Sequence, residues 1–131
     1  MTTVRKFTRS RVQSFGHAFR GWSHVLRTQR NAWLEIAIAV FVFALAFWLG
    51  LDAVRWAVIV LTTAAVFAAE LFNTSIEVLV DLVSPERHPL AKIAKDVAAA
   101  AVLVTACGAV VVGILLLAAP LLERLQSIAA R

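Results

Sequence analysis

Apolar residues fill three long stretches of this chain, and polar residues gather in the segments between them. The first stretch, Ala32 to Leu51, is almost entirely apolar, with one acid, Glu35, near its start. At about 1.5 Å per residue, a helix over this range is long enough to cross a bilayer core of about 30 Å. The pattern therefore predicts a first membrane-spanning helix.

A second helix is expected from Val54 to about Val83, after a turn at Gly50-Leu51-Asp52. Its first half is apolar and its second half carries several acids. Pro85 disfavours helical backbone at the preceding residue, Ser84, so we expect this helix to end near Ser84.

A polar loop, Ser84 to Pro89, leads into a third helix that is apolar from Val97 to about Leu122. Pro89 suits the first turn of a helix, where its missing N–H is not needed. Pro120 should kink or end the helix, because proline removes a backbone hydrogen bond. Residues 123–131 then form a short polar tail.

Residues 1–31 form a basic arm with seven Lys and Arg residues and no acid. Apolar residues recur every three or four positions, and polar residues lie opposite them at the same spacing. This pattern predicts an amphipathic helix that lies in the headgroup layer over anionic lipid. A mitochondrial transit peptide, also Arg-rich and acid-poor, is the alternative. The apolar positions are Val12, Phe15, Phe19, Trp22 and Leu26, and the polar ones are His17, Arg20, His24 and Arg27.

The composition agrees with a membrane protein. The 131 residues are 61% hydrophobic and carry a formal net charge of +5, which is too apolar for an ordinary soluble domain. We therefore predict an all-α integral membrane protein with three transmembrane helices and an N-terminal amphipathic interfacial helix. Its parts are the arm (1–31), a three-span core (32–122) and the tail (123–131).

Several classes of function are excluded by what the sequence lacks. Cys107 is the single cysteine, so there is no disulfide framework and no cysteine metal motif. Glycine-rich phosphate loops and Ser/His/Asp signatures are absent. The basic arm fits anionic lipid better than nucleic acid, because an apolar stripe interleaves it. The tryptophans are expected to anchor the protein at the membrane interface; they are Trp22, Trp33, Trp48 and Trp56.

Lys and Arg bias predicts the orientation in the membrane. The arm carries seven such residues and the second loop region adds Arg87, Lys92 and Lys95, whereas the first loop region offers only Arg55. The N-terminus and the Ser84–Pro89 loop should therefore be cytoplasmic, and the C-terminus should lie on the other side.

One face of the second helix carries a line of polar residues: Glu70, Asn73, Thr74, Glu77 and Asp81. At about 100° per residue they fall within roughly a third of a helical turn. A carboxylate facing lipid costs roughly 2.5–3.5 kcal/mol even on lenient insertion scales. This line must therefore face other protein, water or a bound cation.

Such a line of carboxylates suits a metal-bound polyphosphate. Mg²⁺ is held by one or two carboxylates and by substrate phosphate oxygens, and Lys92 and Lys95 could neutralise phosphate charge. A partly buried carboxylate could act as general base toward a hydroxyl group. Glu70 is about 10 Å deeper along the helix than Glu77, which favours a lipid headgroup at Glu70 and a nucleotide at Glu77.

Three other interpretations stay open on these residues alone. The acids could pair with Lys92, Lys95 or Arg30 and only stabilise a helix bundle. Glu70 and Glu77 could belong to a proton or ion pathway, although Val54 to Ala69 offers few further polar groups. The chain could also be a non-catalytic small membrane protein that recruits partners through its arm.

The segment from Glu70 to Glu77, followed by Asp81, Pro85-Glu86-Arg87-His88-Pro89 and Ala94-Lys95-Asp96, resembles the bacterial diacylglycerol kinase family, which includes the undecaprenol kinases. The resemblance covers nearly the whole chain. It implies a homotrimer of three-span subunits in the bacterial cytoplasmic (inner) membrane. The implied reaction is transfer of the ATP γ-phosphate to a lipid alcohol, with Mg²⁺ and without any nucleic acid partner.

The resemblance also implies roles for individual residues. Glu70 would be the general base that takes the proton of the lipid hydroxyl group, and Asn73 would orient the reacting groups. Glu77 would hold the metal that bridges the ATP phosphates. The remaining residues would contact or cover the nucleotide: His17, Glu86, His88, Lys95 and Asp96.

Two positions depart from the family pattern. Gln29 stands where many members carry a second metal-binding Glu, and it offers a carbonyl oxygen without charge. Glu35 lies six residues further on and is not expected to replace it. Arg87 stands where an aromatic residue is common, and we interpret it as a solvated loop charge. The lipid acceptor, diacylglycerol or undecaprenol, is not specified by these motifs.

Overall fold

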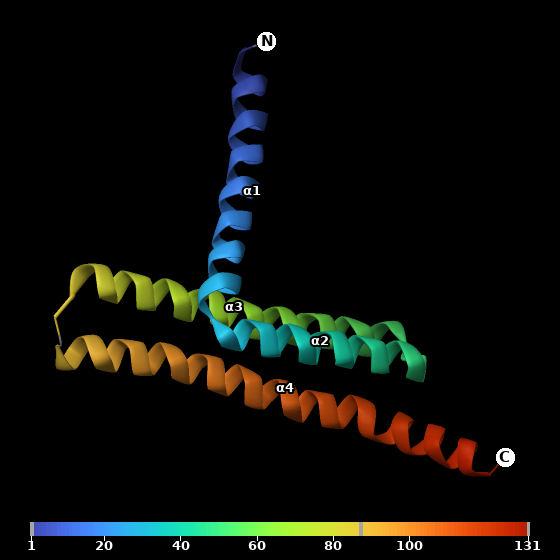
Figure 1. Cartoon of the computed structure of the whole chain (residues 1–131). Helices are drawn as coiled ribbons and strands as arrows, with labels where there is room; N and C mark the ends of the chain where they lie inside the picture. The colour runs from blue at the N-terminus through green and yellow to red at the C-terminus, as the bar shows by residue number, and fades with distance from the viewer. Residues whose placement is uncertain (1, 87, 131) are drawn as a thin grey trace.

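The computed structural model describes the backbone of residues 2–86 and 88–130, and the side chains from residue 13 onward within these ranges. The described part of the chain is helical apart from short connections and contains no strand. In Figure 1, the long apolar helices run alongside one another, and the N-terminal helix leaves this group at a steep angle. This confirms the predicted all-α fold. The helices are α1 (Thr2–Thr28), α2 (Arg30–Leu49), α3 (Ala53–Val83) and α4 (Pro89–Ala129).

The last three helices are each long and apolar enough to cross a membrane, with mean hydropathies of 2.3 for α2, 1.7 for α3 and 2.7 for α4. Many of their large apolar side chains point outward, such as Phe47, which is 81% exposed, and Leu82, which is 78% exposed. Outward-facing apolar side chains suit a lipid environment. The predicted three-span organisation is confirmed at the level of the helices.

The connection between α2 and α3 is the turn that the sequence predicts. Gly50 adopts a left-handed conformation with φ 67°, and its N–H donates to the carbonyl of Phe47 at 3.1 Å. The carboxylate of Asp52 then begins α3 by accepting from the backbone N–H groups of Val54 and Arg55, both at 3.0 Å. These hydrogen bonds, foremost the one from Arg55, lower the pKa of Asp52. The turn therefore fixes α2 and α3 as antiparallel neighbours.

Gly50→Ala should destabilise the protein by about 1–2 kcal/mol, because a Cβ disfavours the left-handed conformation. Gly108 provides a matched control, since it lies inside α4 with open space where a Cβ would be. Gly108→Ala should have the opposite sign, because alanine is the better helix former. Unfolding of both variants in mixed detergent micelles measures the difference. Equal effects of the two substitutions would contradict this account of the turn.

The connection between α3 and α4 also follows the sequence prediction. The N–H of Ser84 donates to the carbonyl of Val80 at 2.8 Å, which closes α3. Pro89 occupies the first turn of α4, and Nδ1 of His88 accepts from the N–H of Leu90 at 3.2 Å. A short polar loop thus joins two long helices that pack against each other.

Pro120 does not end the third span, because α4 continues through it to Ala129. Proline removes only one hydrogen bond, the one to the carbonyl of Leu116 four residues earlier. The extension gains a tertiary contact beyond this point, since the guanidinium of Arg124 lies 5.7 Å from the ring centre of Trp48. Most of the polar tail is therefore a continuation of α4.

The different lengths of the helices set the level of the polar residues. Counted from the turn at Gly50, the 20 residues of α2 span about 30 Å, which matches a bilayer core. Twenty residues from the start of α3, the chain reaches Asn73. Since α3 has 31 residues, its last ten or so extend beyond the start of α2, together with the first part of α4. The acidic line thus begins where the apolar layer ends.

The helix α1 is joined to the spans at this same level. The rings of Trp22 in α1 and Phe67 in α3 meet edge to face, with their centres 5.4 Å apart. The indole N–H of Trp33 donates to the carbonyl of Leu26 at 2.8 Å, which links the start of α2 to the end of α1. In Figure 1, α1 crosses the direction of the spans, as expected for a helix that lies in the membrane plane.

Candidate active site

A buried polar cluster lies on α3 where α2 begins. Glu70 is 1% exposed, Asn73 is 7% exposed and Thr74 is 4% exposed, and they are the buried polar or charged residues within the part of the chain whose side chains are described. The hydroxyl of Thr74 donates to the carbonyl of Glu70 at 2.9 Å. Because burying a carboxylate is costly, such a residue needs a function or a compensating partner.

Glu77 connects this cluster to the junction of α1 and α2. Its Oε2 atom accepts from Nε2 of Gln29 at 2.8 Å, and its Oε1 atom accepts from Nδ2 of Asn73 at 3.1 Å. Gln29 is the extended residue between the two helices, with φ −102° and ψ 114°. Residues 48 positions apart therefore meet in one group. The structure brings Gln29, Asn73 and Glu77 together.

The oxygen atoms of this group suit a hard cation. Oδ1 of Asn73 is buried and has no hydrogen-bond partner among the described residues, so an acceptor oxygen lies free beside Glu77. Gln29 can also offer its carbonyl oxygen if its amide turns. No group of three or more His, Cys, Asp or Glu side chains gathers in the described ranges. One carboxylate and two amide oxygens nevertheless fit Mg²⁺, whose other ligands are typically water and phosphate.

The sequence interpretation gave no functional role to Glu35, which lies in the first turns of α2. Its charge interacts with that of Glu70, whose charge in turn interacts with that of Glu77. The Oε2 atom of Glu35 is buried without a hydrogen-bond partner among the described side chains and backbone. The sequence signal that could have identified Glu35 as a site residue is its position as a single acid inside an apolar span, because such residues are functional candidates by default.

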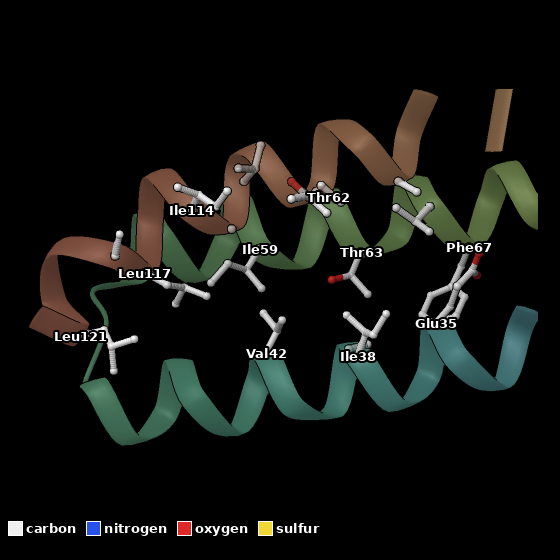
Figure 2. A pocket seen from close by; sticks show the side chains of 18 residues that line it. Glu35, Ile38, Val42, Ile59, Thr62, Thr63, Phe67, Ile114, Leu117 and Leu121 are labelled. Carbon is white, nitrogen blue, oxygen red and sulfur yellow. The ribbon is translucent and has the colours of Figure 1, made fainter. Parts of the chain in front are cut away.

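An apolar cavity of about 500 Å³ begins at Glu35 and runs between α2, α3 and α4. Figure 2 shows Glu35 and Phe67 at one end of it, and Leu117 and Leu121 at the other. Between these ends its labelled walls include Ile38, Val42, Ile59, Thr62, Thr63 and Ile114. The cavity therefore leads from Glu35 into the apolar layer.

A second pocket, of about 560 Å³, lies on the polar side, where α3 meets α4. Nζ of Lys95 forms an ion pair with Oδ1 of Asp81 at 2.5 Å, so one of the pairings considered as purely structural does occur. Both side chains remain partly exposed, and such pairs contribute little to stability. The pocket gathers three residues predicted to contact a nucleotide with two further charges: Glu86, His88 and Lys95, with Asp81 and Lys92.

Two predicted site residues, His17 and Asp96, are not joined to these groups by a described contact. His17 is exposed on α1, where its Nδ1 lies 3.2 Å from a guanidinium nitrogen of Arg20. Asp96 is exposed on α4, beside the residues that line the second pocket. The interpretation of Arg87 as a solvated charge falls outside the described residues.

Comparison with known proteins places this arrangement in a family. The family described as "Prokaryotic diacylglycerol kinase" matches residues 16–117. The chain is 42% identical over 104 residues to the undecaprenol kinase of Bacillus subtilis (strain 168), a match that covers 79% of this chain and 85% of that protein. It is 47% identical over 111 residues to a diacylglycerol kinase of Synechocystis, covering 84% of this chain and 63% of that protein.

A third relative, the diacylglycerol kinase of Escherichia coli (strain K12), is 31% identical over 118 residues, which cover 85% of this chain and 90% of that protein. The matched region contains Gln29, Glu35 and the whole acidic line of α3. The three spans, the buried acidic cluster and these matches agree with one another: the chain belongs to the prokaryotic diacylglycerol kinase family.

Proposed function

We propose that this chain is a membrane lipid kinase that transfers the γ-phosphate of ATP to the hydroxyl group of a lipid alcohol. The observation that carries the proposal is the position of Glu70. Its carboxylate is buried, and its charge interacts with that of Glu77 and with that of Glu35, which lines the apolar cavity. A lipid hydroxyl can approach from the cavity, and a polyphosphate can approach from water.

In this reaction Glu70 takes the proton of the lipid hydroxyl group. The hydroxyl oxygen forms a bond to the γ-phosphorus, and the bond from that phosphorus to the oxygen bridging to the β-phosphate breaks, so ADP leaves. Asn73 lies one turn from Glu70 and bonds Glu77, so it can hold the reacting groups in register. Catalysis of this kind depends mostly on positioning and on electrostatic stabilisation.

Glu77 would hold Mg²⁺, with the amide oxygens of Gln29 and Asn73 beside it. When bound, the ion neutralises negative charge on the phosphates during transfer. The free oxygen of Asn73 and the two hydrogen bonds at Glu77 support this assignment. Gln29 adds no negative charge, so the protein contributes one carboxylate to the ion.

The second pocket would hold the nucleotide. Lys92 and Lys95 supply positive charge for its phosphates, and Glu86 and His88 line the same space. We place Asp96 and His17 at the edge of the bound nucleotide because of their family motif. Lys95 would have to exchange its ion pair with Asp81 for a phosphate oxygen when ATP binds.

The setting that fits these roles is a bacterial cytoplasmic membrane, with the N-terminus and the nucleotide pocket on the cytoplasmic side. The excess of Lys and Arg at that end of the spans supports this orientation. We also propose a homotrimer, as the family resemblance implies. The acceptor is diacylglycerol or undecaprenol, since relatives named for both lipids match this chain.

The proposal is tested by measuring ADP release from purified protein in mixed micelles, with and without a lipid alcohol. ADP should form with Mg²⁺ when diacylglycerol or undecaprenol is added, and the ratio of the two rates identifies the acceptor. If neither lipid stimulates ADP release by the folded protein at any Mg²⁺ concentration, the proposed function is overturned.

Gln29→Glu should lower the Mg²⁺ concentration needed for half-maximal transfer by about tenfold, equivalent to about 1.4 kcal/mol. The reason is that a second carboxylate would replace the uncharged amide beside Glu77. Binding of Mn²⁺, followed by electron paramagnetic resonance in the presence of ATP, gives a readout that is independent of activity. Gln126→Glu, which adds the same charge near the other end of α4, is the control. Equal metal affinity of the two variants would remove Gln29 from the metal site.

A further inference from the structure

The C-terminal end of α4 runs past the rest of the bundle. Leu117 joins the buried core cluster, together with Ala46 of α2 and Ile59 of α3. From there α4 continues to Ala129, about 18 Å further along its axis. Figure 1 shows this end, in red, extending beyond the turn that joins α2 and α3. The family match ends at residue 117, so this extension lies outside the matched region.

The contact with Trp48 sets the level of the extension in the membrane. Trp48 is one residue from the end of α2, whose length of about 30 Å matches the bilayer core. Tryptophan favours the boundary between the apolar layer and the headgroups. The guanidinium of Arg124 lies 5.7 Å from the centre of this ring. Arg124 is therefore expected in the headgroup layer, at the end of the spans opposite to Gln29 and Glu77.

The guanidinium of Arg124 has an aromatic partner, but it forms no ion pair with an acid in the described part of the chain. Arg55, at the same end of the spans, differs because its Nε atom pairs with Oδ2 of Asp52 at 3.3 Å. A guanidinium that stacks on an aromatic face still has the N–H donors at its edge free to bind an anion. The phosphate group of a phospholipid matches this planar set of donors and is abundant in the headgroup layer.

Apolar side chains accompany this guanidinium on both helices. On α4, Leu125 and Ile128 follow Arg124 within about one turn and are 50% and 53% exposed. On α2, Phe41 lies about two turns before Trp48 on the same face and is 66% exposed. Phe41 lies outside the lining of the apolar cavity that begins at Glu35. A phospholipid with its phosphate at Arg124 would therefore find apolar surface for an acyl chain along the outer side of α2.

We propose that Arg124 and Trp48 bind the phosphate group of a phospholipid in the membrane leaflet opposite the candidate active site. The guanidinium donates hydrogen bonds to the phosphate oxygens, and the Trp48 ring holds the guanidinium at the level of the headgroups. The bound lipid joins the end of α4 to α2, beyond the point where Pro120 has removed a backbone hydrogen bond. This lipid is a structural ligand and not a phosphate acceptor, so the inference does not depend on the proposed kinase function.

The indole N–H signal of Trp48 in NMR spectra provides a local test. Protein with isotope-labelled tryptophan is prepared in maltoside micelles, which contain no phosphate, and Trp48→Phe identifies the signal. Adding phosphatidylglycerol should shift this signal, whereas a galactosyl diacylglycerol with the same acyl chains should not, since it lacks phosphate. Inorganic phosphate alone should also leave the signal in place, because it has no acyl chain. An equal shift with the sugar lipid or with inorganic phosphate would overturn the proposal.

Substitutions at Arg124 connect the shift to the proposed site. Arg124→Gln should reduce the shift that phosphatidylglycerol causes at Trp48 by about fivefold or more, because it removes the charged donors. Arg124→Lys keeps the charge without the planar set of donors and should retain part of the shift. Arg55→Gln is the matched control, since Arg55 is already paired with Asp52, and it should respond as wild type does. The signal of Trp33, near the other end of α2, should be the same in all variants and reports that they are folded.

Mass spectrometry of the intact protein gives a second readout that also does not depend on catalysis. Wild type released from micelles containing phosphatidylglycerol should retain more bound phospholipid per chain than Arg124→Gln, and Arg55→Gln should retain as much as wild type. Equal retention by wild type and Arg124→Gln, or an equal shift of Trp48 in the two, would overturn the inference. A loss in Arg55→Gln as large as that in Arg124→Gln would also overturn it, because the effect would then follow from positive charge in general.

Discussion

Glu70→Gln is expected to lower phosphate transfer to the lipid by about 10³-fold or more, because it removes the group that takes the hydroxyl proton. The substitution keeps the shape of the side chain, which matters in a site where Glu70 is 1% exposed. An uncharged amide should also relieve the electrostatic cost of three neighbouring acids. The variant should therefore be at least as stable as wild type while losing activity.

The measurement is single-turnover transfer from γ-labelled ATP, together with unfolding of the same samples in mixed micelles. Nucleotide binding should be unchanged, since Glu70 lies on the lipid side of Glu77. Glu123→Gln provides the control for the amide substitution. Turnover within a factor of about ten of wild type in Glu70→Gln would remove Glu70 from the role of base.

Glu77→Gln is expected to raise the Mg²⁺ concentration for half-maximal activity steeply, by about a hundredfold, which corresponds to about 2.8 kcal/mol. Glu77 is the carboxylate of the proposed metal group, so its loss leaves only amide oxygens. The hydrogen bonds from Gln29 and Asn73 would each lose a charged acceptor, and charged acceptors form the stronger bonds. High Mg²⁺ should restore part of the rate.

The measurement is a titration of activity with Mg²⁺ in Glu77→Gln and in a control variant, Asp52→Asn. The control alters an acid at the opposite end of the spans, so the comparison separates a local effect on the metal site from a general effect of removing an acid. Asp52→Asn should keep the wild-type metal dependence. An unchanged Mg²⁺ requirement in Glu77→Gln would contradict the assignment of Glu77 as a metal ligand, whatever the effect of the substitution on the maximal rate.

The helices could be predicted from the sequence because the signals that define them are local. Gly50 and Asp52 mark a turn by backbone conformation and capping, and Pro89 marks a helix start. The end of α4 could not be predicted in this way. Pro120 is a local signal against helix, and the contact between Arg124 and Trp48 that accompanies the continued helix joins two different spans.

The residues of the candidate site also differ in whether local sequence signals could predict them. Glu70, Asn73 and Glu77 follow from helical spacing alone, since they share one face of α3. The contact of Gln29 with Glu77 depends on how α1 and α2 meet α3, and only the family resemblance indicated it. Glu35 carried no motif, and its place at the end of the cavity became visible when three helices were brought together.

The most direct test of the central claim is to identify the phosphorylated product. Purified protein is supplied with γ-labelled ATP and Mg²⁺, with diacylglycerol and undecaprenol offered separately, and the lipid fraction is analysed for label by mass spectrometry. We predict one lipid monophosphate for each ADP formed, with at least one of the two alcohols. ATP consumed without labelled lipid, or no reaction by protein that is folded, would contradict the account and favour a non-catalytic or ion-pathway role for the Glu70–Glu77 face.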